Sequence, residues 1–170
     1  MSLLPILEFP DPWLRRVAEP VASVEAEHRQ LAADMLEAMY AAQGIGLAAT
    51  QVGRSERLFV LDISQERNQP RVFINPEIIE SAGECRGEEG CLSIPGVTAE
   101  VTRAETLRLR SLNLDGEPIE EQAEGLMAVC IQHELDHLDG KVFLDRLSPL
   151  KRRMIQAKLR KQRQRADEDD

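Results

Sequence analysis

Residues 132–143, QHELDHLDGKVF, hold two histidines and a glutamate at a spacing that suits metal-dependent hydrolysis. His133 and His137 lie four residues apart, so on a helix both imidazoles project from one face. Glu134 lies beside them and offers a carboxylate that can carry a proton. This H-E-x-x-H pattern is typical of zinc metalloproteases. The alternative is a pair of hydrogen-bonded core histidines, since buried neutral rings also need polar partners.

A catalytic metal site needs a third protein ligand and an open position for water or substrate. The extended peptidase pattern H-E-x-x-H-x-x-G-x-x-H requires a histidine where this chain has Phe143. Cys130 lies three residues before His133 on the same predicted helix, so it can bind the ion or pack beside it. The downstream acids Asp139 and Asp145 lie at no recognised metzincin spacing, and spacing alone cannot choose among Cys85, Cys91 and Cys130.

Two helices are predicted around these side chains. Residues 125–138 are apolar nearly all round, which indicates a helix buried within the fold. Residues 24–42 predict another helix, because their apolar residues recur at near-helical spacing. We expect Ser23 to be its N-cap, and Gly44 and Gly46 to end it.

Strand-like segments occupy most of the chain between these helices. Their β-forming residues and alternating patterns predict strands at 57–63, 71–79, 98–103 and 105–114. Asp115 and Gly116 then offer a tight turn into a hairpin partner at 117–125. The predicted fold class is α+β, with antiparallel β-sheets around a central buried helix that carries the H-E-x-x-H motif, and with N-terminal and C-terminal helices.

Three segments together resemble the signature motifs of bacterial peptide deformylases. They are GIGLAATQVG at 44–53, EGCLSIPG at 89–96 and QHELDH at 132–137. They occur in that family's order and at its separations, and the similarity extends along nearly the whole chain. The resemblance implies hydrolysis that removes the N-formyl group from the N-terminal methionine of newly made polypeptides and releases formate. The implied partner is an N-formylmethionyl nascent peptide, processed during translation.

The resemblance also implies a metal site and a proton carrier. The family's ligands correspond to Cys91, His133 and His137, which would hold one divalent ion. In that family the ion in the cell is usually Fe(II), and zinc, nickel or cobalt can replace it. Glu134 corresponds to the residue that takes a proton from the attacking water and later gives it to the leaving amine.

Further roles follow from the same resemblance. The side-chain amide of Gln51 and the main-chain N–H of Leu92 correspond to the donors that stabilise the oxyanion. Gly96 departs from several relatives, which carry glutamate there. Substrate-binding positions are Gly44, Ile45, Gly46, Glu89, Gly90, Leu126, Val129 and Cys130. For the apolar members of this set, ordinary core packing is the alternative interpretation, and both interpretations can hold.

The charge of the chain is uneven. Residues 146–165 hold nine Lys or Arg and no acid, although the net charge of the whole chain is −9. This segment predicts an amphipathic helix at 150–165, and its cations are either a solvated face or a docking surface for an anionic partner. The resemblance favours contact with the ribosome. We expect residues 1–147 to form the catalytic metallohydrolase domain, and 148–170 a basic C-terminal helix with an acidic end.

Composition limits the cellular setting. The three cysteines are an odd number, which favours a reducing compartment. The N-terminal residues lack the pattern of a signal peptide, and no apolar run approaches about 20 residues. We therefore expect a cytoplasmic enzyme with no membrane and no DNA partner.

Two rival functions remain at this point. A zincin-like endopeptidase would share the H-E-x-x-H helix, but Phe143 occupies the place of its third histidine. A structural metal module that binds RNA through its basic tail would not need Glu134 beside the ligands.

Overall fold

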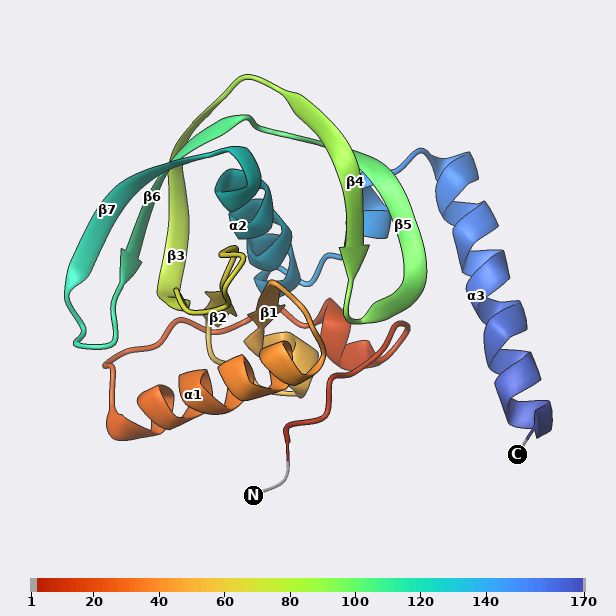
Figure 1. The fold of residues 1–170 in the computed structure, drawn as a ribbon, viewed down its shortest axis with the longest axis horizontal. Coiled ribbons are helices and arrows are strands. Elements are labelled where there is room, and N and C mark those ends of the chain that lie inside the picture. Colours follow the sequence, from red (N-terminus) through yellow and green to blue (C-terminus); the bar gives the residue numbers. More distant parts are fainter. Residues whose placement is uncertain (1–2, 170) are drawn as a thin grey trace.

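Helix α2 (Gly125–Leu138) runs through the middle of the fold and is enclosed by strands (Figure 1). The computed structural model describes residues 3–169. Eight of the fourteen α2 residues are buried, including His133, Glu134 and His137. The predicted α+β architecture, with antiparallel sheets around a buried helix, is confirmed.

The larger sheet has five antiparallel strands in the order β1-β2-β3-β6-β7. Both of its faces are covered, which explains why all four residues of β2 are buried and apolar. Phe59 and Leu61 pack in the cluster shared with α2, whereas Leu58 and Val60 pack in the cluster shared with α1. The strands are β1 (Gly46–Ala48), β2 (Leu58–Leu61), β3 (Arg71–Ala82), β6 (Thr106–Leu112) and β7 (Pro118–Glu124).

A second sheet consists of β4 (Cys85–Cys91) and β5 (Ile94–Arg103), which arch over α2 in Figure 1. Alternate residues of β5 are buried, as expected for a strand with one face on the core. The hairpin between them pairs Cys91 with Ile94, so only Leu92 and Ser93 form its turn. This geometry places Cys91 at the end of a strand and above α2.

Helix α1 (Ala26–Ala41) covers the outer face of the larger sheet, where Met35 and Met39 are completely buried. The prediction that Ser23 caps this helix is wrong, because the N-cap is Glu25. The ring of His28 accepts the Glu25 N–H through Nδ1 at 2.9 Å, which satisfies a donor at the start of the helix. The helix therefore begins later than its apolar pattern suggests.

Helix α3 (Pro149–Asp169) projects from the body beside β5 (Figure 1). Of its residues, only Leu159 is buried, in a cluster that includes Phe143 of the short helix η3 (Phe143–Arg146). The helix extends four residues beyond the predicted end at 165. Among residues 3–169, no helix combines the length and apolar content that a membrane crossing requires.

Candidate metal centre and active site

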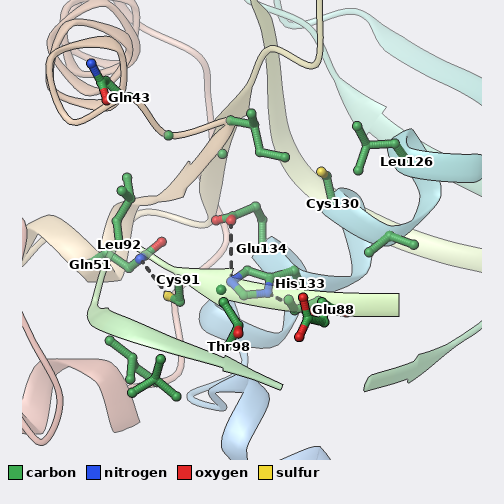
Figure 2. Close-up of a pocket in the computed structure, with 18 of the residues that line it drawn as sticks. Gln43, Gln51, Glu88, Cys91, Leu92, Thr98, Leu126, Cys130, His133 and Glu134 are labelled. Carbon is green, nitrogen blue, oxygen red and sulfur yellow. Dashed lines mark hydrogen bonds and ion pairs between the residues drawn. The ribbon is translucent and has the colours of Figure 1, made fainter. Parts of the chain in front are cut away.

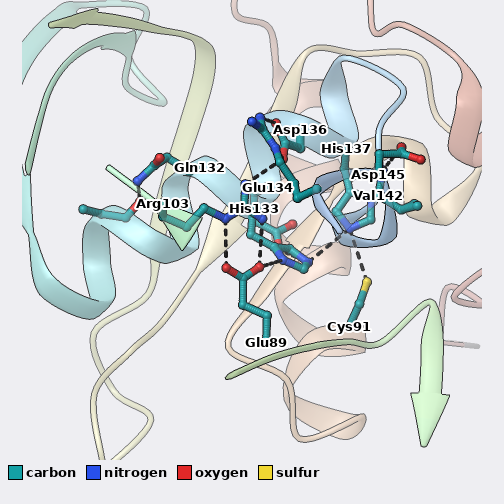
Figure 3. A network of polar contacts seen from close by, with 12 residues as sticks. Glu89, Cys91, Arg103, Gln132, His133, Glu134, Asp136, His137, Val142 and Asp145 are labelled. Carbon is teal, nitrogen blue, oxygen red and sulfur yellow. Dashed lines mark hydrogen bonds and ion pairs between the residues drawn. The ribbon is translucent and has the colours of Figure 1, made fainter. Parts of the chain in front are cut away.

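The side chains of Cys91, His133 and His137 converge on one point above α2. The Nε2 atoms of the two histidines lie 3.3 Å apart, and the Cys91 Sγ lies 3.3 Å from the His137 Nε2. All three ligand atoms lie within 4.8 Å of one another. Figure 3 shows the histidines projecting from successive turns of α2 and the cysteine approaching from β4.

The other candidate ligands lie elsewhere or are occupied. Asp139 forms an ion pair with Arg57, and Asp145 forms one with Arg15. The one hydrogen bond of the Cys85 sulfur within residues 3–169 goes to the Ala104 main-chain carbonyl, at 3.9 Å. Cys130 lines the cleft, where burial, and secondarily the charge of Glu134, raise the pKa of its thiol to about 12. Cys130 is not in the group of donor atoms that lie within 4.8 Å of one another, so it is described as part of the cleft wall.

The donor set fits a divalent cation. His133 contacts Glu89 Oε1 through Nδ1 at 2.9 Å, which leaves its Nε2 directed at the site, as in metal-binding histidines. Burial lowers the pKa of His137 well below its usual value, so this imidazole is neutral and can bind an ion. Burial also opposes protonation of His133, yet Cys91 and Glu89 raise the pKa of His133 to about 10. That shift reveals a negative environment around the ligand atoms, which favours a cation.

Glu134 lies between the ligands and the cleft. Its side chain is buried, with Oε1 3.9 Å from the His133 Nε2, and Oε2 has no hydrogen-bond partner within residues 3–169 (Figure 2). Burial raises the pKa of this carboxyl to about 7, against the opposing effects of His133 and Arg103. An unpaired carboxyl that titrates near neutrality is suited to exchange a proton with substrate or water.

Gln51 is held with its amide group toward the metal ligands. It lies in the short helix η2 (Ala49–Val52), and its Oε1 accepts the Ala48 N–H at 2.9 Å. Its Nε2 donates to the Ser93 Oγ at 2.9 Å and approaches the Cys91 Sγ at 3.6 Å. In the turn above, the Leu92 N–H makes no hydrogen bond within the described chain. A free main-chain N–H and an amide held by Ser93 and Cys91 thus lie at one side of the cleft.

A cleft of about 450 Å³ leads to these groups. Ile45 and Leu126, at its edges, remain 39% and 53% exposed, so the entrance is apolar. Every predicted site residue except His137 lines this cleft; His137 is grouped with Cys91 and His133, whose donor atoms lie within 4.8 Å of its own. The cleft also includes Gly96, where several relatives carry glutamate, and residues that the sequence did not indicate, namely Gln43, Glu88, Ile94, Val97 and Thr98.

A buried charge network supports the ligands from behind (Figure 3). The Arg103 guanidinium donates two bonds of 2.8 Å to Glu89 and one of 2.7 Å to Asp136. Asp136 also accepts two bonds from Arg146, at 3.0 and 2.7 Å. Burial opposes ionisation of Glu89, but Arg103 and His133 lower its pKa to about 2.

This network changes the interpretation of one predicted residue and adds others. Glu89 is a predicted substrate-binding residue that lines the cleft, and both oxygens of its carboxylate are occupied by Arg103 and His133. Arg103 and Asp136 were not among the predicted site residues. Asp136 lies inside the H-E-x-x-H motif itself, whereas nothing in the sequence around Arg103 indicates its partners.

An H-E-x-x-H helix inside antiparallel sheets, with a Cys/His/His donor set and an adjacent free carboxyl, defines a metal-dependent hydrolase. Residues 3–153 match the family model described as polypeptide deformylase. The chain therefore belongs to the polypeptide deformylase family, hydrolases that remove the N-formyl group from nascent peptides.

Individual relatives agree with this assignment. The chain is 59% identical to a peptide deformylase of Alkalilimnicola ehrlichii, over 95% of this chain and 91% of that protein. A crystal structure of a peptide deformylase from Legionella pneumophila superposes with a TM-score of 0.90 at 47% identity, covering 97% of this chain and 98% of that one. A crystal structure of peptide deformylase from Ehrlichia chaffeensis in complex with actinonin superposes with a TM-score of 0.89 at 38% identity, covering 95% of this chain and 98% of that one.

Proposed function

We propose that Cys91, His133 and His137 hold one metal ion and that Glu134 moves the proton during deformylation. The observation that carries this proposal is the convergence of three ligand atoms within 4.8 Å, beside a buried carboxylate oxygen without a partner. When bound, the ion supplies a Lewis acid that polarises the formyl carbonyl and lowers the pKa of the attacking water. Iron(II) is the proposed ion in the cell, and a thiolate with two imidazoles also suits zinc, nickel or cobalt.

Glu134 is the proposed general base and then general acid. Its free oxygen faces the cleft, so it can take a proton from water as the formyl carbon is attacked. It then gives that proton to the leaving amine, which departs as the new amino terminus. The buried position keeps bulk water away from the transfer.

Gln51 and Leu92 are the proposed oxyanion donors. The contacts from Ala48 and Ser93 hold the Gln51 amide in one orientation, so little reorganisation is needed as charge develops. The free N–H of Leu92 approaches from the hairpin turn. Both donors belong to segments that also position Cys91, which links charge stabilisation to the metal site.

The apolar part of the cleft is the proposed pocket for the methionine side chain. Ile45, Leu126, Val129 and Cys130 line it, and the neutral thiol of Cys130 behaves as a small apolar group there. Gly90 of β4 also lines the cleft and, having no side chain, leaves the main chain of β4 accessible to an extended peptide. The substrate class is therefore a peptide that begins with N-formylmethionine.

Formate release from formyl-Met-Ala-Ser tests the proposal, using protein isolated without oxygen and analysed for metal. Glu134→Gln should keep the metal but lower kcat about 10²- to 10⁴-fold, the usual contribution of a positioned proton carrier. Iron should predominate in the anaerobic preparation, and air should inactivate it through the iron or Cys91. A metal-replete wild type that releases no formate would refute the proposed activity, and digestion of casein would then favour an endopeptidase.

We further propose that α3 docks on the ribosome, as a basic extension of a catalytic domain formed by residues 1–147. Its cations Lys158, Arg160 and Lys161 are exposed and make no ion pair within residues 3–169. Leu150 and Met154 are each 64% exposed on the same helix. A projecting helix with cations and exposed apolar side chains suits an RNA-rich partner. A cytoplasmic location, without membrane or DNA partners, belongs to the same proposal.

Sedimentation with ribosomes tests this second proposal. Reversal of four charges (R160E, K161E, R163E and R165E) in the full chain should abolish binding while turnover of formyl-Met-Ala-Ser persists. A control variant with two charges reversed on the sheet surface, R108E and R110E, should keep ribosome binding. Deletion of 148–170 should give the same loss. Undiminished, salt-insensitive sedimentation of the charge-reversed protein would refute ribosome docking through α3.

A further inference from the structure

The turn between β2 and β3 carries an arginine that reaches the edge of the cleft without lining it. The Arg67 guanidinium donates to the main-chain carbonyl of Gly44, a residue of the cleft wall. Its Cζ lies 5.1 Å from the centroid of the Tyr40 ring, a cation–π contact. Within residues 3–169, Arg67 forms no ion pair. Its charge is therefore directed at a ring and a carbonyl rather than at an acid.

The turn that presents Arg67 is fixed by a buried carboxylate. Asp62 is completely buried and accepts the Ser64 N–H at 2.9 Å and the Gln69 N–H at 3.1 Å. It also accepts the Tyr40 hydroxyl at 2.6 Å. The Asp62 carboxylate thus holds both the turn that carries Arg67 and the Tyr40 ring that Arg67 contacts. The main-chain N–H of Asp62 in turn donates to the Ile45 carbonyl at 2.8 Å, so this group also holds the cleft wall.

The backbone of Arg67 has an unfavourable conformation. Its φ is +58°, in the left-handed region that residues other than glycine seldom adopt. Such conformations persist where the surroundings determine them, and they concentrate at functional sites. Here the conformation lies within a turn whose side chain ends on the Gly44 carbonyl.

The contact matters because of the peptide unit that it holds. The Gly44 carbonyl and the Ile45 N–H belong to one planar group and point in opposite directions. The Ile45 N–H makes no hydrogen bond within the described residues, although the Ile45 carbonyl is bonded. We infer that Arg67 is a positioning residue that, by holding the Gly44 carbonyl, keeps the Ile45 N–H directed at the main chain of the bound formyl-peptide.

Steady-state kinetics with formyl-Met-Ala-Ser test this inference, which rests on the proposed function. Arg67→Met should raise KM about tenfold, the equivalent of one hydrogen bond, and leave kcat within about twofold. Arg67→Lys, which keeps a cationic donor but not the planar fork, should recover part of that loss. Arg54→Met is the matched control, because Arg54 is exposed and its one ion pair within residues 3–169 is with half-buried Glu56, in another turn.

Binding of the product Met-Ala-Ser to the zinc-loaded proteins, measured by calorimetry, gives a readout independent of turnover. Arg67→Met should weaken Met-Ala-Ser binding by about the same factor as it raises KM. Its metal content and melting temperature should match those of the Arg54→Met control. Equal KM and equal Met-Ala-Ser affinity in the two variants would overturn the inference. If Arg67→Met fails to fold, Arg67→Gln replaces it under the same criteria. Glutamine is polar but too short to reach the Gly44 carbonyl. A wild type that releases no formate refutes the proposed function, whereas unchanged KM beside an active wild type refutes only the role of Arg67.

Discussion

Gly46 lies so close to the Glu134 side chain that a Cβ at Gly46 would lie 2.9 Å from the Glu134 Oε1 and 3.1 Å from its Cγ. A glycine in β1 thus leaves the space that the proposed proton carrier fills. Glycine is required at position 46 because the Glu134 side chain comes so close to the main chain there, and not because of an unusual backbone angle. This relationship connects the first signature segment with the H-E-x-x-H helix, which lie far apart in the sequence.

Gly46→Ala should therefore impair catalysis without removing the metal. The new methyl group must displace the carboxylate, and we expect kcat to fall about 10²-fold, within the contribution of a positioned proton carrier. Steady-state kinetics with metal analysis check this prediction. Gly87→Ala is the matched control, since a Cβ at Gly87 meets nothing within 4 Å. Equal kcat in the two variants would contradict the steric argument.

Gln51→Leu should lower kcat with little effect on the fold. The substitution keeps the approximate volume but removes the amide that is aimed at the Cys91 side of the cleft. Loss of one oxyanion donor typically lowers kcat about 10²- to 10³-fold. The control is Ser93→Ala, which removes only the partner that orients the amide and should have a smaller effect. A kcat ratio near one for Gln51→Leu would exclude it from charge stabilisation.

Arg103→Met should destabilise the protein and weaken metal binding. It leaves Glu89 and Asp136 buried without their shared cation, a loss of about 3–5 kcal/mol of unfolding free energy. Because Glu89 orients His133, metal affinity should fall about 10- to 100-fold. Denaturant unfolding and competition with a chelator measure the two effects.

The control for that experiment is Arg108→Met. Arg108 also bridges two carboxylates, Glu80 and Glu120, but on an exposed sheet surface, where ion pairs contribute about 0–1 kcal/mol. The two variants thereby compare the same Arg→Met substitution in a buried network and on the protein surface. Similar losses for the two variants would mean that burial of the Arg103 network adds nothing.

The sequence predicted the parts of the site that lie on one regular element. His133, Glu134 and His137 share a helix whose apolar composition also indicated its burial. Cys91 was left undecided among three cysteines by spacing, because a hairpin brings it to the helix from more than 40 residues away, as its contact with His137 shows. Only the resemblance to a family selected it.

Other features could not be predicted, because they depend on contacts between residues far apart in the sequence or on side-chain geometry. Strand β4 was not predicted, because Gly87, Gly90 and its acids are poor strand formers, and pairing with β5 holds it extended. The partners of Arg103 come from β4 and α2, so its burial could not be inferred from neighbouring residues. The cap of α1 likewise depends on the ring of His28.

Asp62→Asn should reduce stability in a pH-dependent way. Burial opposes ionisation of this carboxyl, but hydrogen bonds from Ser64 and Tyr40 lower its pKa to about 2. Because its folded pKa lies below the unfolded value of about 3.9, the ionised group stabilises the fold at neutral pH. That contribution is lost as the pH falls from about 4 towards 2. Near neutrality the loss of charge-assisted bonds should cost about 2 kcal/mol.

The measurement is the difference in unfolding free energy between wild type and Asp62→Asn across that pH range. The difference should be constant from pH 5 to 7 and should shrink below about pH 4, as protonation removes the advantage of the wild-type carboxylate. Asp115→Asn is the control, because Asp115 is exposed and pairs only with exposed Arg29. A difference that grows on acidification would reverse the sign required by a depressed pKa and would show that the ionised carboxylate does not stabilise the turn that carries Arg67.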